Sequence, residues 1–217
     1  MILLIFCLSG LAAVVVTIGG IVLSLEGFSG MKQERFSPLN HFISELGDNR
    51  FAKHHRIFNI SMFAGGILFI PFVIGIASLG TSLVFYIIVL VVGLAATIGL
   101  SLVGVFPEEK ERTHTAVAGV FFFCTSLLVL FFIISLLMQQ LSMFPSWVVY
   151  PSIAALAVAV IFIIDTVQLP KWEMERTYRP WDWDPDPRPT FWLNPFLEWC
   201  AVLSLMAWFF IVIVLCF

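Results

Sequence analysis

The strongest constraint on this fold is a series of six apolar runs, each about as long as a bilayer is thick. A membrane-spanning helix needs roughly 20 predominantly apolar residues. Runs of that length cover 2–25, 58–79, 82–106, 114–138, 147–167 and 193–217. Only 12% of the residues are charged, and the polar segments between the runs are too short to form a second core. We therefore predict an all-α integral membrane protein, a six-helix transmembrane bundle that forms a single domain over residues 1–217.

The charged residues predict how this bundle is threaded. If the spans alternate in direction, the polar segments 26–57, 107–113 and 168–192 share one face, and all 11 Lys and Arg residues lie there. Lys and Arg in short loops favour the cytoplasmic side. We therefore predict a multi-pass protein of the cell membrane, with the charged loops in the cytoplasm and both termini external.

The charge also limits the expected partners. The formal net charge is −3, and no basic run with interleaved aromatic residues is present to follow a phosphate backbone. We expect no nucleic acid as a partner. Membrane lipid is the expected partner, with a second membrane protein or a second copy of the chain as further candidates.

A short helix at about 38–46 is predicted after the first span. Ser37 is a typical cap, Pro38 suits the first helical position, and Gly47 follows the end. Apolar residues recur at helical spacing at Leu39, Phe42, Ile43 and Leu46. The opposite face then carries Asn40, His41, Ser44 and Glu45. Two placements are open: an interfacial helix with this polar face in water, or one that turns it inward over Asn59 and His114.

All four histidines lie at the charged face, at positions 41, 54, 55 and 114. Histidine suits both proton transfer and metal ligation. By ligand type, a zinc site can be drawn from His41, Glu45, one of His54 and His55, and His114. No HExxH-like spacing supports that set. Zinc is therefore only a candidate cofactor.

Further polar residues at this face add to the candidate site. Glu108 and Glu109 are either solvated or fold back beside His114, where a carboxylate can orient the imidazole. On the second span, His55 and Asn59 share a stripe with Gly66, where a neighbouring helix can approach closely. Two carboxylates near span ends, Asp165 and Glu198, can face a cavity or extend toward the interface. The Trp- and Pro-rich segment 168–192 is predicted to be an interfacial anchor or lid.

Two motifs resemble a known family. They are Pro38-Leu39-Asn40-His41-Phe42-Ile43-Ser44-Glu45-Leu46-Gly47 with Phe58-Asn59 after it, and Gly104-Val105-Phe106-Pro107 with His114 a turn later. They resemble the prokaryotic six-helix membrane proteins of domain-of-unknown-function family 998. More distantly, the chain is similar to the damage-regulated autophagy modulator family, which includes the post-GPI-attachment remodelling factor. The match covers roughly residues 2–138, and spans five and six match only in hydropathy.

The resemblance implies a six-span bundle and a lipid-linked role, but no particular reaction. The family-like positions in this chain are Ser44, Glu45, Gly47, Asn59, Pro107 and His114. In the eukaryotic relatives, the loop after the first span is expected to face the lumen or exterior. The Lys and Arg count places that loop in the cytoplasm, and we follow the count.

Three functions compete at this stage. In an enzyme acting on a lipid headgroup or acyl ester, His41 or His114 is the general base, Glu45 orients or protonates, and Ser44 is the nucleophile or oxyanion donor. Asn40, His55, Asn59 and Glu108 then bind the substrate. The alternatives are a non-catalytic lipid or proton carrier, and a structural subunit of a larger membrane assembly. No internal inverted repeat of the kind common in transporters is visible.

Overall fold

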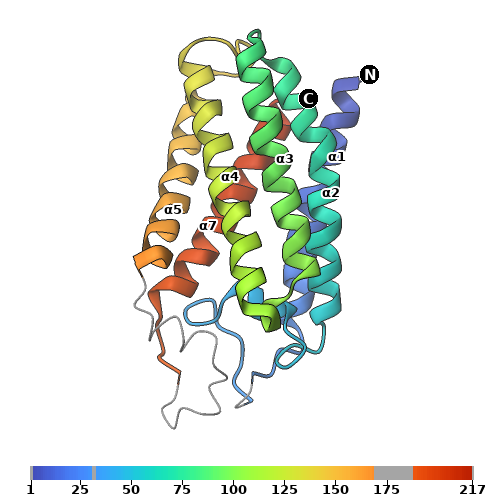
Figure 1. The fold of residues 1–217 in the computed structure, drawn as a ribbon, viewed down its shortest axis with the longest axis vertical. Helices are drawn as coiled ribbons and strands as arrows, with labels where there is room; N and C mark the ends of the chain where they lie inside the picture. The colour runs from blue at the N-terminus through green and yellow to red at the C-terminus, as the bar shows by residue number, and fades with distance from the viewer. Residues whose placement is uncertain (1, 31–32, 169–187, 217) are drawn as a thin grey trace.

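The computed structural model describes residues 2–30, 33–168 and 188–216, and a bundle of long helices dominates it (Figure 1). The long helices are α1 (Ile2–Leu25), α2 (His55–Leu79), α3 (Leu83–Val105), α4 (Glu111–Leu137), α5 (Val149–Gln168) and α7 (Leu193–Leu215). Three short 3-10 helices join them: η1 (Ile43–Gly47), η2 (Glu108–Lys110) and η3 (Ser146–Val148). Six helices of the described chain are long and apolar enough to cross a membrane. The predicted six-helix bundle is confirmed.

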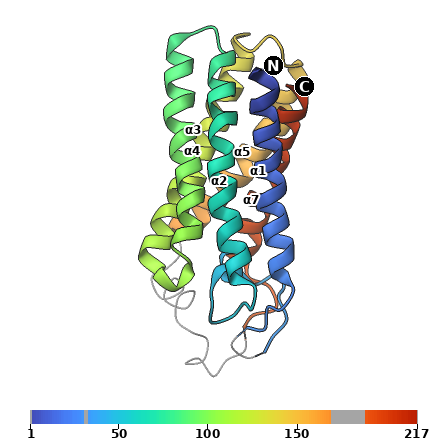
Figure 2. The same ribbon diagram turned by 90° about the vertical axis from the view of Figure 1, so that its right-hand side faces the viewer.

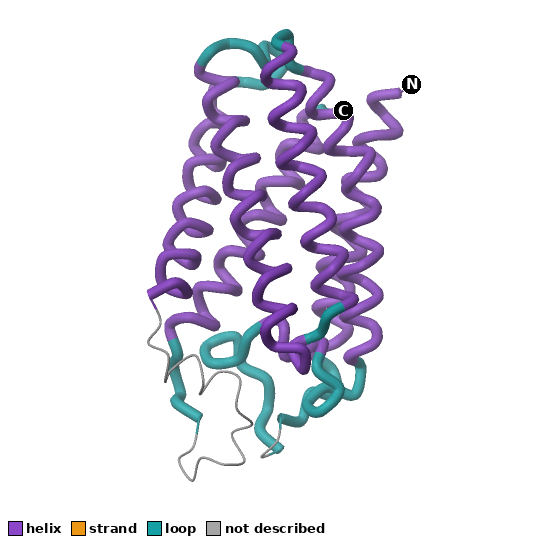
Figure 3. The backbone as a smooth tube through the Cα atoms, viewed as in Figure 1, coloured by secondary structure: helices purple, strands orange, loops and turns teal. Residues whose placement is uncertain are grey.

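The helices pack in the order of the chain, and α7 completes the bundle against both α1 and α5. Figures 1 and 2 show both termini at one end of the bundle and the first polar loop at the other. The described loops at that polar end are the more extensive ones (Figure 3). The alternating order of the spans is as expected, while the side of the membrane that each end faces stays a prediction.

The backbones of α2 and α3 approach each other closely, because glycines lie where the two helices cross. A Cβ atom at Gly66 would lie 2.5 Å from the carbonyl oxygen of Thr97. A Cβ atom at Gly104 would overlap the carbonyl oxygen of Asn59 and lie 2.8 Å from the backbone nitrogen of Phe63. The close approach predicted at Gly66 is confirmed.

Aromatic side chains of α7 join the helices around it. Trp208 Nε1 donates a hydrogen bond to Ser152 Oγ on α5 at 2.8 Å. The Trp208 ring meets Phe132 of α4 edge to face, with the ring centres 5.3 Å apart. Phe209 lies 4.7 Å from Phe69 of α2. Through these side chains, α7 contacts α2, α4 and α5.

The first polar loop is closed at its base and folds back against the bundle. Ser29 N donates to Phe51 O at 3.0 Å, and Lys53 N donates to Gly27 O at 3.2 Å. Between these points, every residue from 41 to 48 is buried. The loop therefore forms the polar end of the protein interior, and it does not lie on the membrane surface with one face in water.

The predicted helix over 38–46 is wrong. One turn forms, in which His41 N donates to Ser37 O at 2.9 Å, and the chain then extends at Phe42 before η1 begins. In an α-helix, the N–H of Ile43 would donate a hydrogen bond to the carbonyl oxygen of Leu39. Instead, Ile43 N donates to Glu198 of α7 at 2.7 Å, and Leu39 O accepts from Trp192 N at 2.8 Å. Contacts distant in sequence replace the local helical bonds.

The other boundaries differ from the sequence prediction by a few residues. Thr113 was the predicted cap of the fourth span, but α4 begins at Glu111, so Thr113 lies within its first turn. Most of the predicted anchor or lid segment lies outside the described residues.

Candidate functional site

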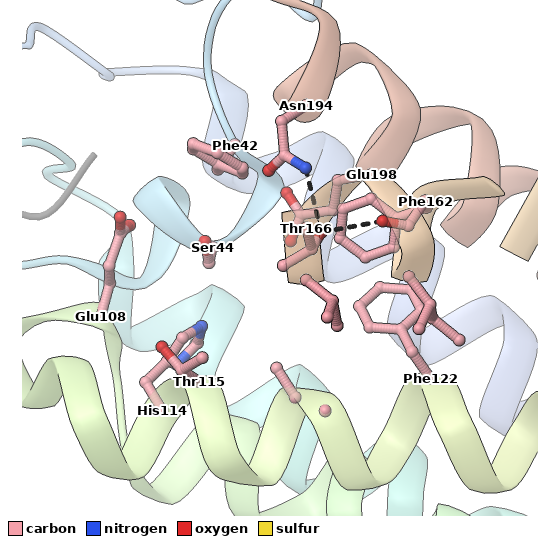
Figure 4. Close-up of a pocket in the computed structure, with 14 residues that line it drawn as sticks. Phe42, Ser44, Glu108, His114, Thr115, Phe122, Phe162, Thr166, Asn194 and Glu198 are labelled. Carbon is pink, nitrogen blue, oxygen red and sulfur yellow. Dashed lines mark hydrogen bonds between the residues drawn. The ribbon is translucent and has the colours of Figure 1, made fainter. Parts of the chain in front are cut away.

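A cavity of about 230 Å³ lies at the polar end of the bundle, between α4, α5 and α7, with the first polar loop beside it (Figure 4). Seven of its lining residues carry polar side chains: Ser44, Glu108, His114, Thr115, Thr166, Asn194 and Glu198. The other seven are Phe42, Ala118, Gly119, Phe122, Phe162, Ile163 and Val167. The cavity is therefore amphiphilic, with a polar group of side chains and an apolar wall.

The apolar wall follows the seam between α4 and α5. Deeper in the bundle, the rings of Phe122 and Phe162 close this seam at a centre-to-centre distance of 4.7 Å. Toward the polar end the seam is open: a Cβ atom at Gly119 would meet nothing within 4 Å, and Val167 is 76% exposed. The cavity thus reaches the flank of the bundle that a surrounding bilayer would contact.

His114 lies at the polar end of the cavity, near the start of α4, and is only 6% exposed. Its Nδ1 lies 2.8 Å from the carbonyl oxygen of Phe106. Because a carbonyl only accepts, this contact requires a proton on Nδ1. The described residues offer Nε2 no hydrogen-bond partner, so this nitrogen remains for a molecule in the cavity.

Glu108 folds inward and lines the cavity with His114, as the second of the two sequence interpretations proposed. It is 5% exposed, and its Oε2 has no hydrogen-bond partner among the described residues. Glu109 points elsewhere: it is exposed, and its Oε1 accepts a hydrogen bond from Asn49 N at 2.9 Å. Adjacent carboxylates therefore have different environments.

The last helix supplies two polar side chains to the opposite side of the cavity, at Asn194 and Glu198 (Figure 4). Asn194 Nδ2 donates to Asp165 Oδ2 and to Thr166 Oγ1, both at 2.9 Å, which ties the start of α7 to the end of α5. Glu198 is 8% exposed and holds the backbone N–H of Ile43. Figure 4 shows Ser44 between Glu108 and Glu198.

Glu45 lies behind the cavity and does not line it. Its carboxylate accepts two hydrogen bonds from Arg188, at 2.8 and 2.9 Å, and a third from Phe42 N at 2.9 Å. Arg188 also donates to the carbonyl oxygen of Asn40 at 2.8 Å, and Asn40 Nδ2 donates to Pro189 O at 2.7 Å. Glu45 and Asn40 therefore hold residues 188–189 against the first loop.

His41 is buried among aromatic rings. Phe28 and Phe36 each lie 5.1 Å from its ring centre, and Trp199 Nε1 donates to its backbone oxygen at 3.0 Å. Burial lowers the pKa of His41 below its ordinary value of 6.5, while the Glu45 carboxylate opposes that shift. Its Nδ1 contacts Ser37, so no hydrogen bond joins His41 to Ser44 as the nucleophile-and-base pair requires.

Asn59 and His55 also lie outside the cavity lining. Asn59 Nδ2 donates to the carbonyl oxygen of Gly47 at 2.9 Å. A Cβ atom at Gly47 would lie 2.5 Å from Asn59 Oδ1, so glycine is needed for this close approach. His55 Nδ1 contacts Ala52 O at 2.9 Å at the start of α2. Both residues fix the first loop to α2.

The zinc candidates are not brought together. Among the described residues, no three His, Cys, Asp or Glu side chains are arranged to hold a metal ion. Of the four candidates, only His114 lines the cavity. The structure gives a zinc ion no ligand set at this site.

Of the eight predicted site residues, the structure brings Ser44, Glu108 and His114 together in the cavity. Sequence reasoning did not include Asn194, Thr115 and Thr166 among the site residues, and it noted Glu198 only as a carboxylate near a span end. One signal was available: Asn194 and Glu198 are four residues apart at the start of an apolar helix, so they share one face.

The fold and the cavity together define a multi-pass helical membrane protein with an amphiphilic pocket near one end of its spans. Residues 11–215 match the model of the family described as Protein of unknown function (DUF998), and the chain belongs to that family. The resemblance is confirmed, and it extends beyond residue 138 to the last two spans. No curated protein and no solved structure matches the chain, so the distant similarity to the damage-regulated autophagy modulator family is not shown.

Proposed function

We propose that this protein binds a membrane lipid, with the headgroup in the cavity and the acyl chain passing out between α4 and α5. The observation that carries this proposal is the open seam at Gly119, which joins a polar cavity to the lipid-facing flank of the bundle. Ionisable side chains inside a membrane protein commonly mark a substrate path.

The size of the cavity supports entry of the headgroup alone. The cavity volume is about 230 Å³. That volume is below the roughly 300–1,000 Å³ of pockets that enclose a whole drug-sized ligand. A lipid therefore fits only if its chains stay in the bilayer, which is what an opening in the flank permits.

The proposal covers binding and not ester cleavage. Ser44 lines the cavity, but the described residues supply no hydrogen bond from its hydroxyl to a base, which an activated serine requires.

Blocking the seam tests the proposal. Helical side chains lean toward the helix N-terminus, so a tryptophan in Gly119→Trp extends toward Thr115 and the polar end of the cavity. Gly19→Trp on α1 is the matched control, because a Cβ atom there also meets nothing within 4 Å. The readout is the lipid that co-purifies in mild detergent, quantified by mass spectrometry.

We expect Gly119→Trp to retain about one tenth of the lipid that the parent binds. A tenfold change corresponds to about 1.4 kcal/mol in binding free energy. The parent and Gly19→Trp should retain theirs. Equal lipid content in all three proteins would overturn the proposal.

A further inference from the structure

Among the described residues, the carboxyl groups that line the cavity form no ion pair. Four carboxyl side chains at this end of the bundle are less than 10% exposed: Glu45, Asp48, Glu108 and Glu198. Moving a carboxylate out of water is costly unless a cation or hydrogen-bond donors compensate it. Whether each of these four carboxyl groups has a compensating cation or donor therefore indicates which kind of group is missing from the cavity.

Two of the four have arginine partners. Glu45 binds Arg188 through both carboxylate oxygens. Asp48 accepts from Arg50 Nε at 3.0 Å on each oxygen, and from Arg50 Nη2 at 2.5 Å. Neither Glu45 nor Asp48 lines the cavity.

The other two carboxyl groups form no ion pair or hydrogen bond with a Lys or Arg side chain of the described residues, and both line the cavity. Glu198 receives only the backbone N–H of Ile43. Glu108 Oε2 is buried, and no described residue donates a hydrogen bond to it. The unpaired, buried Glu108 oxygen is an observation separate from the clustering of acids, and it indicates that a donor is missing at the cavity.

We propose that the polar end of the cavity binds a primary ammonium group carried on an apolar chain, with Glu108 and Glu198 as its counter-ions. This inference rests on the proposed lipid-binding function and adds the chemical class of the headgroup. A primary ammonium has three N–H donors and no acceptor. Glu108, Glu198 and His114 all line the cavity and carry acceptor atoms for such donors.

Other headgroup charges fit less well. An anionic headgroup would face two carboxyl groups without a cation at the cavity wall. A quaternary ammonium has the right charge but no N–H to donate to Glu108 Oε2. A neutral hydroxyl supplies one donor and no charge. Of these four headgroups, only the primary ammonium supplies both the charge and several donors.

Native mass spectrometry of the purified protein tests this with four amphiphiles that share a dodecyl chain: dodecylamine, dodecyltrimethylammonium, dodecanol and dodecanoate. Free ethanolamine is a fifth probe, which separates an amine on a lipid chain from a small soluble amine. The variants are Glu108→Gln and Glu198→Gln. The matched control is Glu109→Gln, the same change one residue along the chain and outside the cavity.

We expect the parent to bind dodecylamine about tenfold more tightly than dodecanol or dodecyltrimethylammonium, and dodecanoate least. Glu108→Gln and Glu198→Gln should bring dodecylamine down to the level of dodecanol, while Glu109→Gln keeps the preference. Binding of dodecanol by each variant shows that its cavity is folded.

Two outcomes overturn this inference and leave the lipid-binding function standing: dodecanol binding as tightly as dodecylamine to the parent, or a preference for the amine that survives both Glu substitutions. Two others overturn the lipid-binding function itself. These are binding of no amphiphile by the parent, and binding of ethanolamine as tight as that of dodecylamine.

Discussion

The α2–α3 seam and the α4–α5 seam are built in opposite ways. At the first, glycines at 66 and 104 bring two backbones into direct contact, and any added carbon collides with main-chain atoms. At the second, Gly119 faces open space, and the helices meet only further along, at Phe122 and Phe162. The same residue type therefore closes one flank of the bundle and leaves the other open.

The two flanks also differ in what holds their polar ends. The first loop is fixed to α2 by a neutral hydrogen bond between Asn59 and Gly47. On the α5–α7 side the contacts involve charge: Arg188 binds Glu45 of the first loop, and Asn194 of α7 binds Asp165 of α5. Shape complementarity thus stabilises the closed flank, whereas charge stabilises the region beside the pocket.

The largest effect is expected from the charge pair. Arg188→Gln leaves the Glu45 carboxylate buried without its partner, and breaking a buried pair costs about 3–5 kcal/mol. We expect Arg188→Gln to lower the melting temperature, which is measured by tryptophan fluorescence in detergent. The control is Arg112→Gln, which removes one positive charge from an exposed side chain.

The double variant Glu45→Gln with Arg188→Gln sharpens this result, because it removes both charges together. It should be more stable than Arg188→Gln alone. Equal melting temperatures for the parent and Arg188→Gln would show that charge does not hold this end of the bundle.

A smaller loss is expected at the closed flank. In Gly104→Ala, the new methyl group would overlap the carbonyl oxygen of Asn59, so α3 must move away from α2. Overpacking of this kind costs about 1–3 kcal/mol. The melting temperature in detergent measures it. A loss no greater than that of an alanine substitution elsewhere on α3 would contradict the tight seam.

The pH dependence should also belong to the loop side. Burial holds the pKa of His41 below 6.5, so the folded state binds fewer protons than the unfolded state once the pH falls below that value. Stability is therefore full above pH 6.5 and decreases as the pH drops toward the folded pKa. His41 faces Glu34, Glu45 and Arg188, so a substitution is needed to separate its contribution.

His41→Gln should reduce the loss of melting temperature between pH 7.5 and pH 5.5. The variant starts from a lower melting temperature, because His41 packs against Phe28 and Phe36. Only the slope is compared. An unchanged slope in His41→Gln would assign the pH dependence to other groups.

Hydropathy was sufficient to predict the six spans, because a bilayer requires a minimum apolar length for each helix. It could not predict the loop between α1 and α2. Cap and periodicity signals there favour a helix, but Glu198 and Trp192, more than 150 residues away, take the hydrogen bonds that the helix would need. Local patterns do not contain these partners.

The candidate site was predicted in part for the same reason. Glu108 and His114 lie six residues apart, at the ends of one short connection, so their proximity could be inferred. Glu45 was predicted to orient or protonate in a catalytic site. Its partner Arg188 lies 143 positions along the chain, and that pairing makes Glu45 a residue of the folded framework.

The smallest effect on the melting temperature is expected at the open α4–α5 seam. Its sign is opposite to that of the effect at the closed α2–α3 seam. In Gly119→Ala the added methyl group meets no atom within 4 Å, so the collision that penalises Gly104→Ala is absent. Alanine is favoured over glycine inside a helix by up to about 1 kcal/mol. The melting temperature of Gly119→Ala should therefore equal or slightly exceed that of the parent. A clear loss of stability in this variant would mean that α4 and α5 pack closely at residue 119, which would remove the structural basis for lipid entry through this seam.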